Sequence, residues 1–163
     1  MEPTLLTLSK SLGQVLNQHG LTISTAESCT GGLLSHAITA VSGSSAYFIG
    51  GVVAYSNAIK AEVLAVQSST LEAFGAVSQQ TACEMAEGIR IKFSTDVGLS
   101  TTGIAGPTGG TAEKPVGLVW MGISTAETTR AFACHFLGER LEIMHQTVIE
   151  VLSRTLDLLR TDN

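Results

Sequence analysis

The hydrophobic positions of this chain switch between helical and extended spacing along its length. Leucine and valine residues at 5–16 recur every three or four positions, which predicts an amphipathic helix that ends near Gly20. The same spacing predicts helices over residues 33–41, 79–93 and 141–159. The buried stripe of the last helix is expected to hold Leu141, Met144, Val148, Val151, Leu152, Thr155 and Leu159. Shorter apolar runs lie between these predicted helices.

Those shorter runs predict strands, at residues 21–24, 51–55, 96–101, 116–124 and 128–136. The pair Gly50-Gly51 predicts a bulge or a close approach of two backbones. Ser56 and Asn57 are expected to cap a short helix over residues 58–64. Residues 67–76 are expected to form a connection with room for a helical turn.

Strands alternate with helices early in the chain, and a hairpin comes late. This order predicts an α/β protein: a three-layer α/β/α sandwich around a mixed, mostly parallel sheet of about five strands. The chain has no internal repeat, low-complexity tract or linker, so we expect one domain over residues 1–163.

The composition of the chain excludes several classes of protein and of binding partner. Hydrophobic residues make up 44% of the chain and charged residues 14%, which excludes a disordered protein. A net charge of −5 and an aromatic content of 5% argue against a nucleic-acid partner. No apolar run reaches the ~18 residues of a membrane span, and the N-terminus lacks a signal-peptide pattern. We therefore expect a cytoplasmic protein with no membrane partner.

Cysteine and histidine residues give no pattern of a metal site. The three cysteines are odd in number and widely spaced, which suits reduced thiols better than a disulfide framework. No Cys-x-x-Cys or His-x-x-x-His pattern occurs, and the four histidines are scattered. We expect no metal and no cofactor.

The junction at residues 25–32, Thr-Ala-Glu-Ser-Cys-Thr-Gly-Gly, lies between a predicted strand and a predicted helix. Such a junction directs backbone N–H groups and the positive end of a helix dipole at one spot. Ser28 and Cys29 are two candidate nucleophiles there, and Gly31 and Gly32 would let a ligand approach the backbone. An N-cap hydroxyl is the alternative for Ser28, and a small buried side chain is favoured for Cys29.

A serine nucleophile needs a base, and no histidine lies in a predicted strand-end loop, which argues against a Ser-His-Asp arrangement. Lys60 is the better candidate, because a partly buried lysine can be neutral at working pH. Tyr55, at the preceding strand end, could bridge Ser28 and Lys60 by a hydrogen bond. A solvated helix lysine is the alternative for Lys60.

The glycine-rich segment at residues 102–110 matches neither the phosphate-loop pattern nor a dinucleotide fingerprint. Its amides could still hold a phosphate or an oxyanion, and Arg140 could add a cation, with ordinary surface charge as the alternative. Ligands bind at the carboxyl ends of strands in open α/β sheets. One ligand could therefore touch this segment, the junction at residues 25–32 and a second junction at residues 55–60.

At these residues the chain resembles the C-terminal domain family of CinA, which includes stand-alone nicotinamide-nucleotide amidohydrolases. Those enzymes convert nicotinamide mononucleotide to nicotinate mononucleotide and ammonia. The resemblance implies an α/β/α domain of the anticodon-binding-domain-like type with one antiparallel strand, and a metal-independent serine amidase. The motifs that carry it are Thr25-Ala-Glu-Ser-Cys-Thr-Gly-Gly32, Gly43-Ser-Ser-Ala46, Tyr55-Ser-Asn57 with Lys60, Gly75-Ala-Val-Ser78, Gly103-Ile-Ala-Gly-Pro107 and Lys114-Pro-Val-Gly117.

The resemblance also implies roles for single residues. Ser28 would be the nucleophile, Lys60 the general base and Tyr55 an assisting residue. The residues expected to contact the substrate or organise the site are Thr30, Gly31, Gly32, Thr102, Gly103 and Arg140.

The expected partner is a small-molecule nucleotide substrate, and apolar helices with modest charge favour a homo-oligomer. Two alternatives stay open. One is a non-catalytic pyridine-nucleotide-binding or regulatory domain of the competence or damage-inducible type. The other is hydrolysis of a different small amide by the same residues.

Overall fold

A computed structural model describes residues 3–161. Residues 1, 2, 162 and 163, the ends of the predicted domain, lie outside the described residues. The helices and strands are, in chain order, α1 (Pro3–His19), β1 (Ile23–Glu27), α2 (Leu33–Thr39), the 3₁₀ turn η1 (Ser44–Ala46), β2 (Phe48–Val53), α3 (Asn57–Leu64), α4 (Ser68–Phe74), α5 (Gln79–Phe93), β3 (Val97–Gly103), β4 (Leu118–Ser124), β5 (Thr129–His135) and α6 (Arg140–Thr161).

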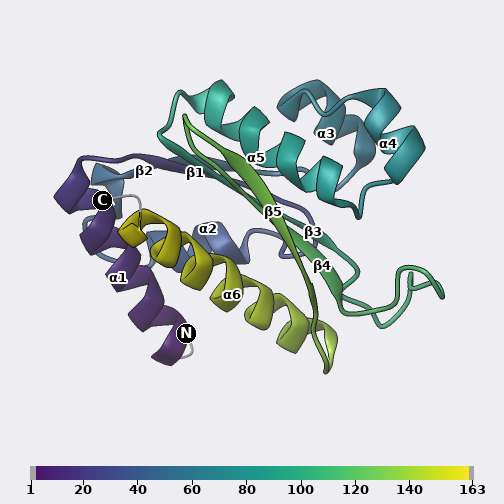
Figure 1. The fold of residues 1–163 in the computed structure, drawn as a ribbon. Helices are drawn as coiled ribbons and strands as arrows, with labels where there is room; N and C mark the ends of the chain where they lie inside the picture. The colour runs from purple at the N-terminus through teal and green to yellow at the C-terminus, as the bar shows by residue number, and fades with distance from the viewer. Residues whose placement is uncertain (1–2, 162–163) are drawn as a thin grey trace.

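The strands form one sheet in the order β2-β1-β3-β4-β5 (Figure 1). β1 is parallel to β2 and β3, whereas β4 is antiparallel to both β3 and β5. One strand therefore runs against the other four. This confirms the predicted mixed, mostly parallel sheet, and the late hairpin is the pair β4 and β5.

Helices cover both faces of the sheet. Figure 1 shows α3, α4 and α5 on one face, and α1, α2 and α6 on the other. The larger hydrophobic core lies on the second face, where α1 and α6 pack together, and a smaller core under α3 and α5 contains Leu64, Met85 and Ile89. The predicted three-layer α/β/α arrangement is confirmed.

The strand pairing brings three carboxyl ends to one edge of the sheet. Glu27, the last residue of β1, pairs with Val53 of β2 on one side and with Thr101 of β3 on the other. Residues that follow these strands therefore start from neighbouring points. Ser28, Tyr55 and Thr102 reach the same region for this reason.

Several predicted strand boundaries are wrong, because buried polar residues extend the strands. β1 continues past Ser24 to Glu27, and all five of its residues are buried. β3 continues through Thr102 and Gly103, which the sequence assigned to a loop. Serine, threonine and glutamate in these positions mask the burial that an apolar run would reveal.

The glycine pair in β2 was predicted to mark a bulge or a close backbone approach, and the structure has a register shift beside it and close side-chain neighbours at Gly51. The register with β1 shifts between Ile23, opposite Phe48, and Ser24, opposite Gly50, which is a bulge. A Cβ atom on Gly51 would lie 2.6 Å from Ser35 Oγ of α2 and would collide with the Thr25 hydroxyl. β2 can approach α2 only because this position has no side chain.

The buried stripe of α6 differs from the prediction at its first turn. Leu141 is 68% exposed, and Ile143 and Thr147 are buried in its place. The Thr147 hydroxyl donates to the Ile143 carbonyl at 2.7 Å, so this polar residue is satisfied within the helix. The pattern of apolar residues could not show that Thr147 is buried, because its hydroxyl is satisfied by a backbone carbonyl of the same helix.

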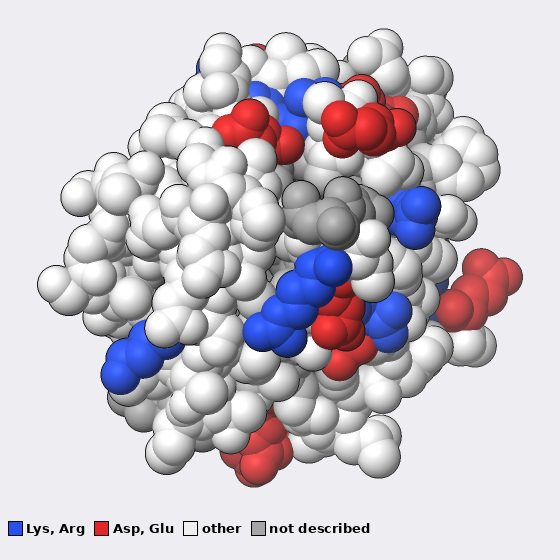
Figure 2. Space-filling view, turned by 60° about the vertical axis from the view of Figure 1, so that its left-hand side comes forward, with Lys and Arg blue, Asp and Glu red and all other residues white. Residues whose placement is uncertain are grey.

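The surface carries few charges. On the face drawn in Figure 2, uncharged residues cover most of the area, and basic and acidic side chains lie close together in small mixed groups. No helix within residues 3–161 is both long enough and apolar enough to cross a membrane.

Candidate active site

A pocket of about 240 Å³ lies at the carboxyl ends of β1, β2 and β3. It brings together residues from all three junctions that the sequence singled out, although they are far apart in the chain. Its lining consists of Ser28, Cys29, Tyr55, Asn57, Lys60, Ala76, Val77, Thr102, Gly103, Ala105 and Arg140.

Ser28 and Lys60 contact each other directly in this pocket. Lys60 Nζ donates to Ser28 Oγ at 3.1 Å and to the Ala54 carbonyl at 2.8 Å. The lysine is 1% exposed, and no carboxylate among residues 3–161 forms an ion pair with it. Burial lowers the pKa of Lys60 below its ordinary value, because the ammonium form has lost its water. The arrangement favours a neutral amine beside a serine hydroxyl.

The position of Lys60 follows from the packing of α3. Ser56 caps this helix, since its Oγ accepts from the Ile59 amide at 3.2 Å. Lys60 and Leu64 are the buried residues of α3 and lie one turn apart, so they share a face. Leu64 packs into the smaller core, which turns Lys60 inward toward the sheet.

Glu27 occupies the start of α2. Its carboxylate is fully buried and accepts from the amides of Gly32, Leu34 and Ser35 at 3.0, 3.0 and 2.8 Å. The hydroxyls of Thr30 and Ser35 also donate to it, each at 2.6 Å. The expectation that these helix-start donors face a ligand is wrong, because Glu27 takes them.

Other backbone bonds fix the turn between Ser28 and Gly32. The amide of Ser28 donates to the Thr101 carbonyl at 2.9 Å, and that of Gly31 to the Ser28 carbonyl at 3.2 Å. The N–H groups of Cys29 and Thr30 donate to no other residue within 3–161. Cys29 lines the pocket and Thr30 does not, so the Cys29 N–H is the donor of this turn that remains for a ligand.

The structure places Thr30, Gly31 and Gly32 outside the pocket lining. Thr30 is fully buried, and its hydroxyl lies 2.7 Å from the Thr101 hydroxyl as well as contacting Glu27. Gly31 and Gly32 have φ of 60° and 103°, a left-handed conformation that favours glycine. All three residues shape the turn without lining the pocket.

Arg140 joins two edges of the pocket. Its Nη1 donates to the Gly106 carbonyl at 2.8 Å, and its Nη2 to the Tyr55 hydroxyl at 2.9 Å. The alternative of ordinary surface charge does not describe this residue. The predicted Tyr55 bridge between Ser28 and Lys60 is also wrong, because those two touch directly and the Tyr55 hydroxyl meets Arg140.

Thr102 and Gly103 line the pocket from the end of β3. The Thr102 hydroxyl donates to the Ala76 carbonyl at 2.7 Å, which ties β3 to the segment before α5. A Cβ atom on Gly103 would lie 2.7 Å from the Leu118 carbonyl oxygen of β4. Close strand packing alone therefore demands glycine at this position.

Cys29 is the second candidate nucleophile, and its side chain is 6% exposed. Burial raises the pKa of this thiol to about 12, and the Glu27 carboxylate acts in the same direction. The thiol stays protonated near neutral pH, which makes it a poor nucleophile.

Comparison with known proteins identifies the family. Residues 5–159 match the family model described as the CinA C-terminal domain. A CinA-like protein of Salinibacter ruber is 47% identical over 156 residues, which is 94% of this chain. The chain belongs to the CinA C-terminal domain family. It spans about a third of the length of the curated relatives it matches.

Solved structures of CinA relatives have the same fold and similar length. The competence/damage inducible protein CihA from Agrobacterium tumefaciens superposes with a TM-score of 0.94 at 39% identity, covering 97% of each chain. A competence or damage-inducible protein from Enterobacter asburiae gives 0.93 at 35% identity, covering 97% of this chain and 99% of that one.

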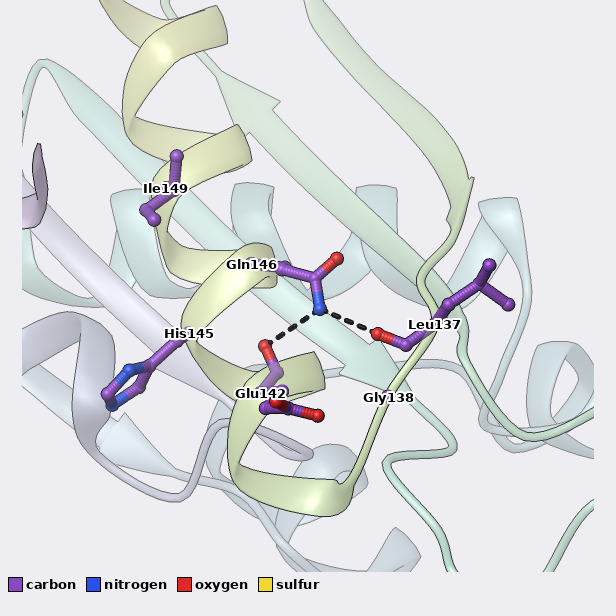
Figure 3. Close-up of a pocket in the computed structure, with 6 residues that line it drawn as sticks. All are labelled: Leu137, Gly138, Glu142, His145, Gln146 and Ile149. Carbon is purple, nitrogen blue, oxygen red and sulfur yellow. Dashed lines mark hydrogen bonds between the residues drawn. The ribbon is translucent and has the colours of Figure 1, made fainter.

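This CinA domain has a larger cavity, of about 560 Å³, beside the start of α6 (Figure 3). The predicted site residues do not line it. Its polar groups bond one another: Gln146 Nε2 donates to the Leu137 and Glu142 carbonyls at 2.8 and 3.2 Å. It offers no nucleophile beside a base, so the Ser28 pocket is the better candidate site.

The polar side-chain groups of the Ser28 pocket are hydroxyls, a carboxamide, a thiol, an amine and a guanidinium, with no carboxylate, which suits a neutral or anionic ligand better than a cation. Within residues 3–161, no group of three or more His, Cys, Asp or Glu side chains could hold a metal ion.

Sequence reasoning missed the roles of Glu27 and Asn57. Glu27 was part of the quoted motif but received no role, although a lone acid just before a glycine-rich helix start signals a carboxylate cap. Asn57 was interpreted only as a cap, yet it lines the pocket. Ala76, Val77 and Ala105 carried no chemical signal that could have placed them there.

The raised pKa of Cys29 gives a direct test of the site's electrostatics. Alkylation requires the thiolate, so we expect iodoacetamide at pH 8 to modify Cys29 at least about 100-fold more slowly in the folded protein than in the denatured chain. Peptide mapping by mass spectrometry measures both rates. Rapid alkylation of Cys29 in the folded protein would contradict the assignment.

Proposed function

We propose that this CinA-family domain hydrolyses the carboxamide of nicotinamide mononucleotide, releasing nicotinate mononucleotide and ammonia. The observation that carries the proposal is the 3.1 Å contact between Ser28 Oγ and the buried Lys60 Nζ. The family resemblance supplies the substrate.

In the first half-reaction Ser28 Oγ attacks the carboxamide carbon, and its proton passes to Lys60 Nζ. The carbonyl oxygen becomes an oxyanion in the tetrahedral intermediate. The N–H group of Cys29, which follows the nucleophile in the turn and lines the pocket, is the proposed donor to it. Lys60 then protonates the leaving nitrogen, the C–N bond breaks, and ammonia departs from an ester on Ser28.

In the second half-reaction Lys60 takes a proton from water, whose oxygen attacks the ester carbon. Collapse of the second tetrahedral intermediate returns the proton to Ser28 Oγ and releases the acid. One lysine serves both halves as base and then as acid, and a lowered pKa favours this role because it makes the neutral amine easier to reach.

The pocket size suits partial enclosure of the substrate. At about 240 Å³ it is smaller than the roughly 300–1,000 Å³ of pockets that enclose a whole ligand. We place the nicotinamide ring inside, against Thr102 and Gly103, and the ribose phosphate at the mouth. Tyr55, 61% exposed, and the remaining donors of Arg140 would contact the ribose phosphate there.

Removing either member of the pair tests the mechanism. We expect Ser28→Ala and Lys60→Met to lower ammonia release from nicotinamide mononucleotide by at least about 1,000-fold, because the nucleophile or its base is gone. A coupled ammonia assay on purified, metal-free protein measures this. The matched controls are Cys29→Ala and Lys92→Met, the latter on an exposed lysine of α5. Near-normal turnover by Ser28→Ala would refute the serine mechanism.

The direction of the Lys60 pKa shift predicts the pH profile. The neutral amine is the active base, so kcat/KM should rise with pH through a group whose pKa lies below the ordinary lysine value of 10.5. Lys60→Arg should be inactive across the range, because a guanidinium stays protonated. A profile that rises only above pH 10.5 would contradict a lowered pKa.

A regulatory, non-catalytic role is the second candidate. It is favoured by the names of the relatives, which refer to competence and damage induction rather than to amide hydrolysis. Calorimetric binding of nicotinamide mononucleotide without acid product would support it. Turnover of another carboxamide in a substrate panel would instead support the same chemistry on a different substrate.

A further inference from the structure

We propose that Glu27 is a positioning residue for the reaction of Ser28: its carboxylate holds the turn over residues 28–32 so that Ser28 Oγ stays beside Lys60 Nζ and the Cys29 amide stays available to the developing oxyanion. This inference rests on the proposed serine chemistry, and it assigns the reaction a residue that does not line the pocket.

The main chain of Glu27 is fixed on both sides. It pairs with Val53 of β2 and with Thr101 of β3, and its carbonyl accepts from the Ala54 amide at 2.8 Å. Its carboxylate then spans the turn to the first residues of α2. A single residue thus ties the strand before Ser28 to the helix after it.

The middle of the turn is also fastened to this carboxylate. The Thr30 hydroxyl contacts Glu27 Oε2 at 2.6 Å and the Thr101 hydroxyl at 2.7 Å, and both threonines are fully buried. Cys29, whose amide donates to no other residue within 3–161, lies between this anchor and Ser28.

Five donors converge on the two oxygens of Glu27, which only a carboxylate satisfies. A glutamine has the same size, but its NH₂ group would face donors. Glu27→Gln therefore disturbs the turn while preserving volume. Ser35→Ala is a milder change, because it removes one hydroxyl donor and leaves the carboxylate in place.

The chain offers a matched control for a purely structural carboxylate. Glu84 accepts from the Gln67 amide at 2.8 Å and from the Thr70 hydroxyl at 2.6 Å, at the start of α4. It has the same local task at another helix start and does not line the Ser28 pocket. Glu84→Gln should cost stability without altering the chemistry.

The test measures how fast a fluorophosphonate modifies Ser28, followed by intact-protein mass, together with kcat and KM for ammonia release. In the labelling step Ser28 Oγ bonds to phosphorus, fluoride leaves, and the serine proton passes through Lys60 to solvent. We expect folded Glu27→Gln to lower the labelling rate and kcat by about 10- to 100-fold, with KM within about threefold. Glu84→Gln should stay within about twofold in both.

Circular dichroism establishes that each variant is folded. Labelling of folded Glu27→Gln at the wild-type rate would overturn the proposal, as would an equal loss in Glu84→Gln. If Glu27→Gln does not fold, Ser35→Ala decides: slower labelling supports the proposal, and an unchanged rate overturns it. If wild-type protein is labelled at Ser28 but releases no ammonia, the proposed substrate is wrong. The labelling rates of the variants still test the role of Glu27 in that case. Wild-type protein that resists labelling overturns the Glu27 proposal as well.

Discussion

The buried carboxylate of Glu27, which forms no ion pair within residues 3–161, holds the nucleophile junction together. An isolated carboxylate in a protein interior is strongly unfavourable unless hydrogen bonds replace its water. Glu27 meets that requirement through two hydroxyls and three amides, and the positive end of α2 adds to the stabilisation. The strand before Ser28, the turn that contains it and the helix after it are therefore joined into one unit by the hydrogen bonds of a single side chain.

Lys60 is the opposite case on the other side of Ser28. It is as buried as Glu27, but its Nζ meets a hydroxyl and backbone carbonyls rather than an anion. Burial consequently lowers the pKa of Lys60, whereas the hydrogen bonds around Glu27 serve a charged group. Five hydrogen bonds replace the water of the buried Glu27 carboxylate, whereas the buried Lys60 amine has no anion beside it among residues 3–161. This difference favours a neutral lysine as the base for Ser28, in a pocket whose lining contains no histidine.

The sequence predicted the elements whose apolar positions follow a clean period, such as α1 and α5, and the sheet type followed from their order. It misplaced the ends of β1 and β3, because Thr25, Glu27 and Thr102 are polar and buried, and their partners lie far along the chain. It brought Ser28 and Lys60 together through the rule that ligands bind at strand ends, and the family resemblance gave them the roles of nucleophile and base. It missed Glu27, because the partners of a charged residue are visible only in three dimensions, and for the same reason it placed Tyr55 between two groups that touch.

The central claim is that Ser28 forms an ester with the substrate's acyl group while Lys60 moves the protons. The most direct measurement is a rapid acid quench of the protein during turnover of nicotinamide mononucleotide, followed by peptide mapping by mass spectrometry. The account predicts a nicotinate mononucleotide adduct on the peptide that carries Ser28, located on the serine, and its absence in Ser28→Ala. An adduct on Cys29, or steady release of acid by Ser28→Ala, would contradict it.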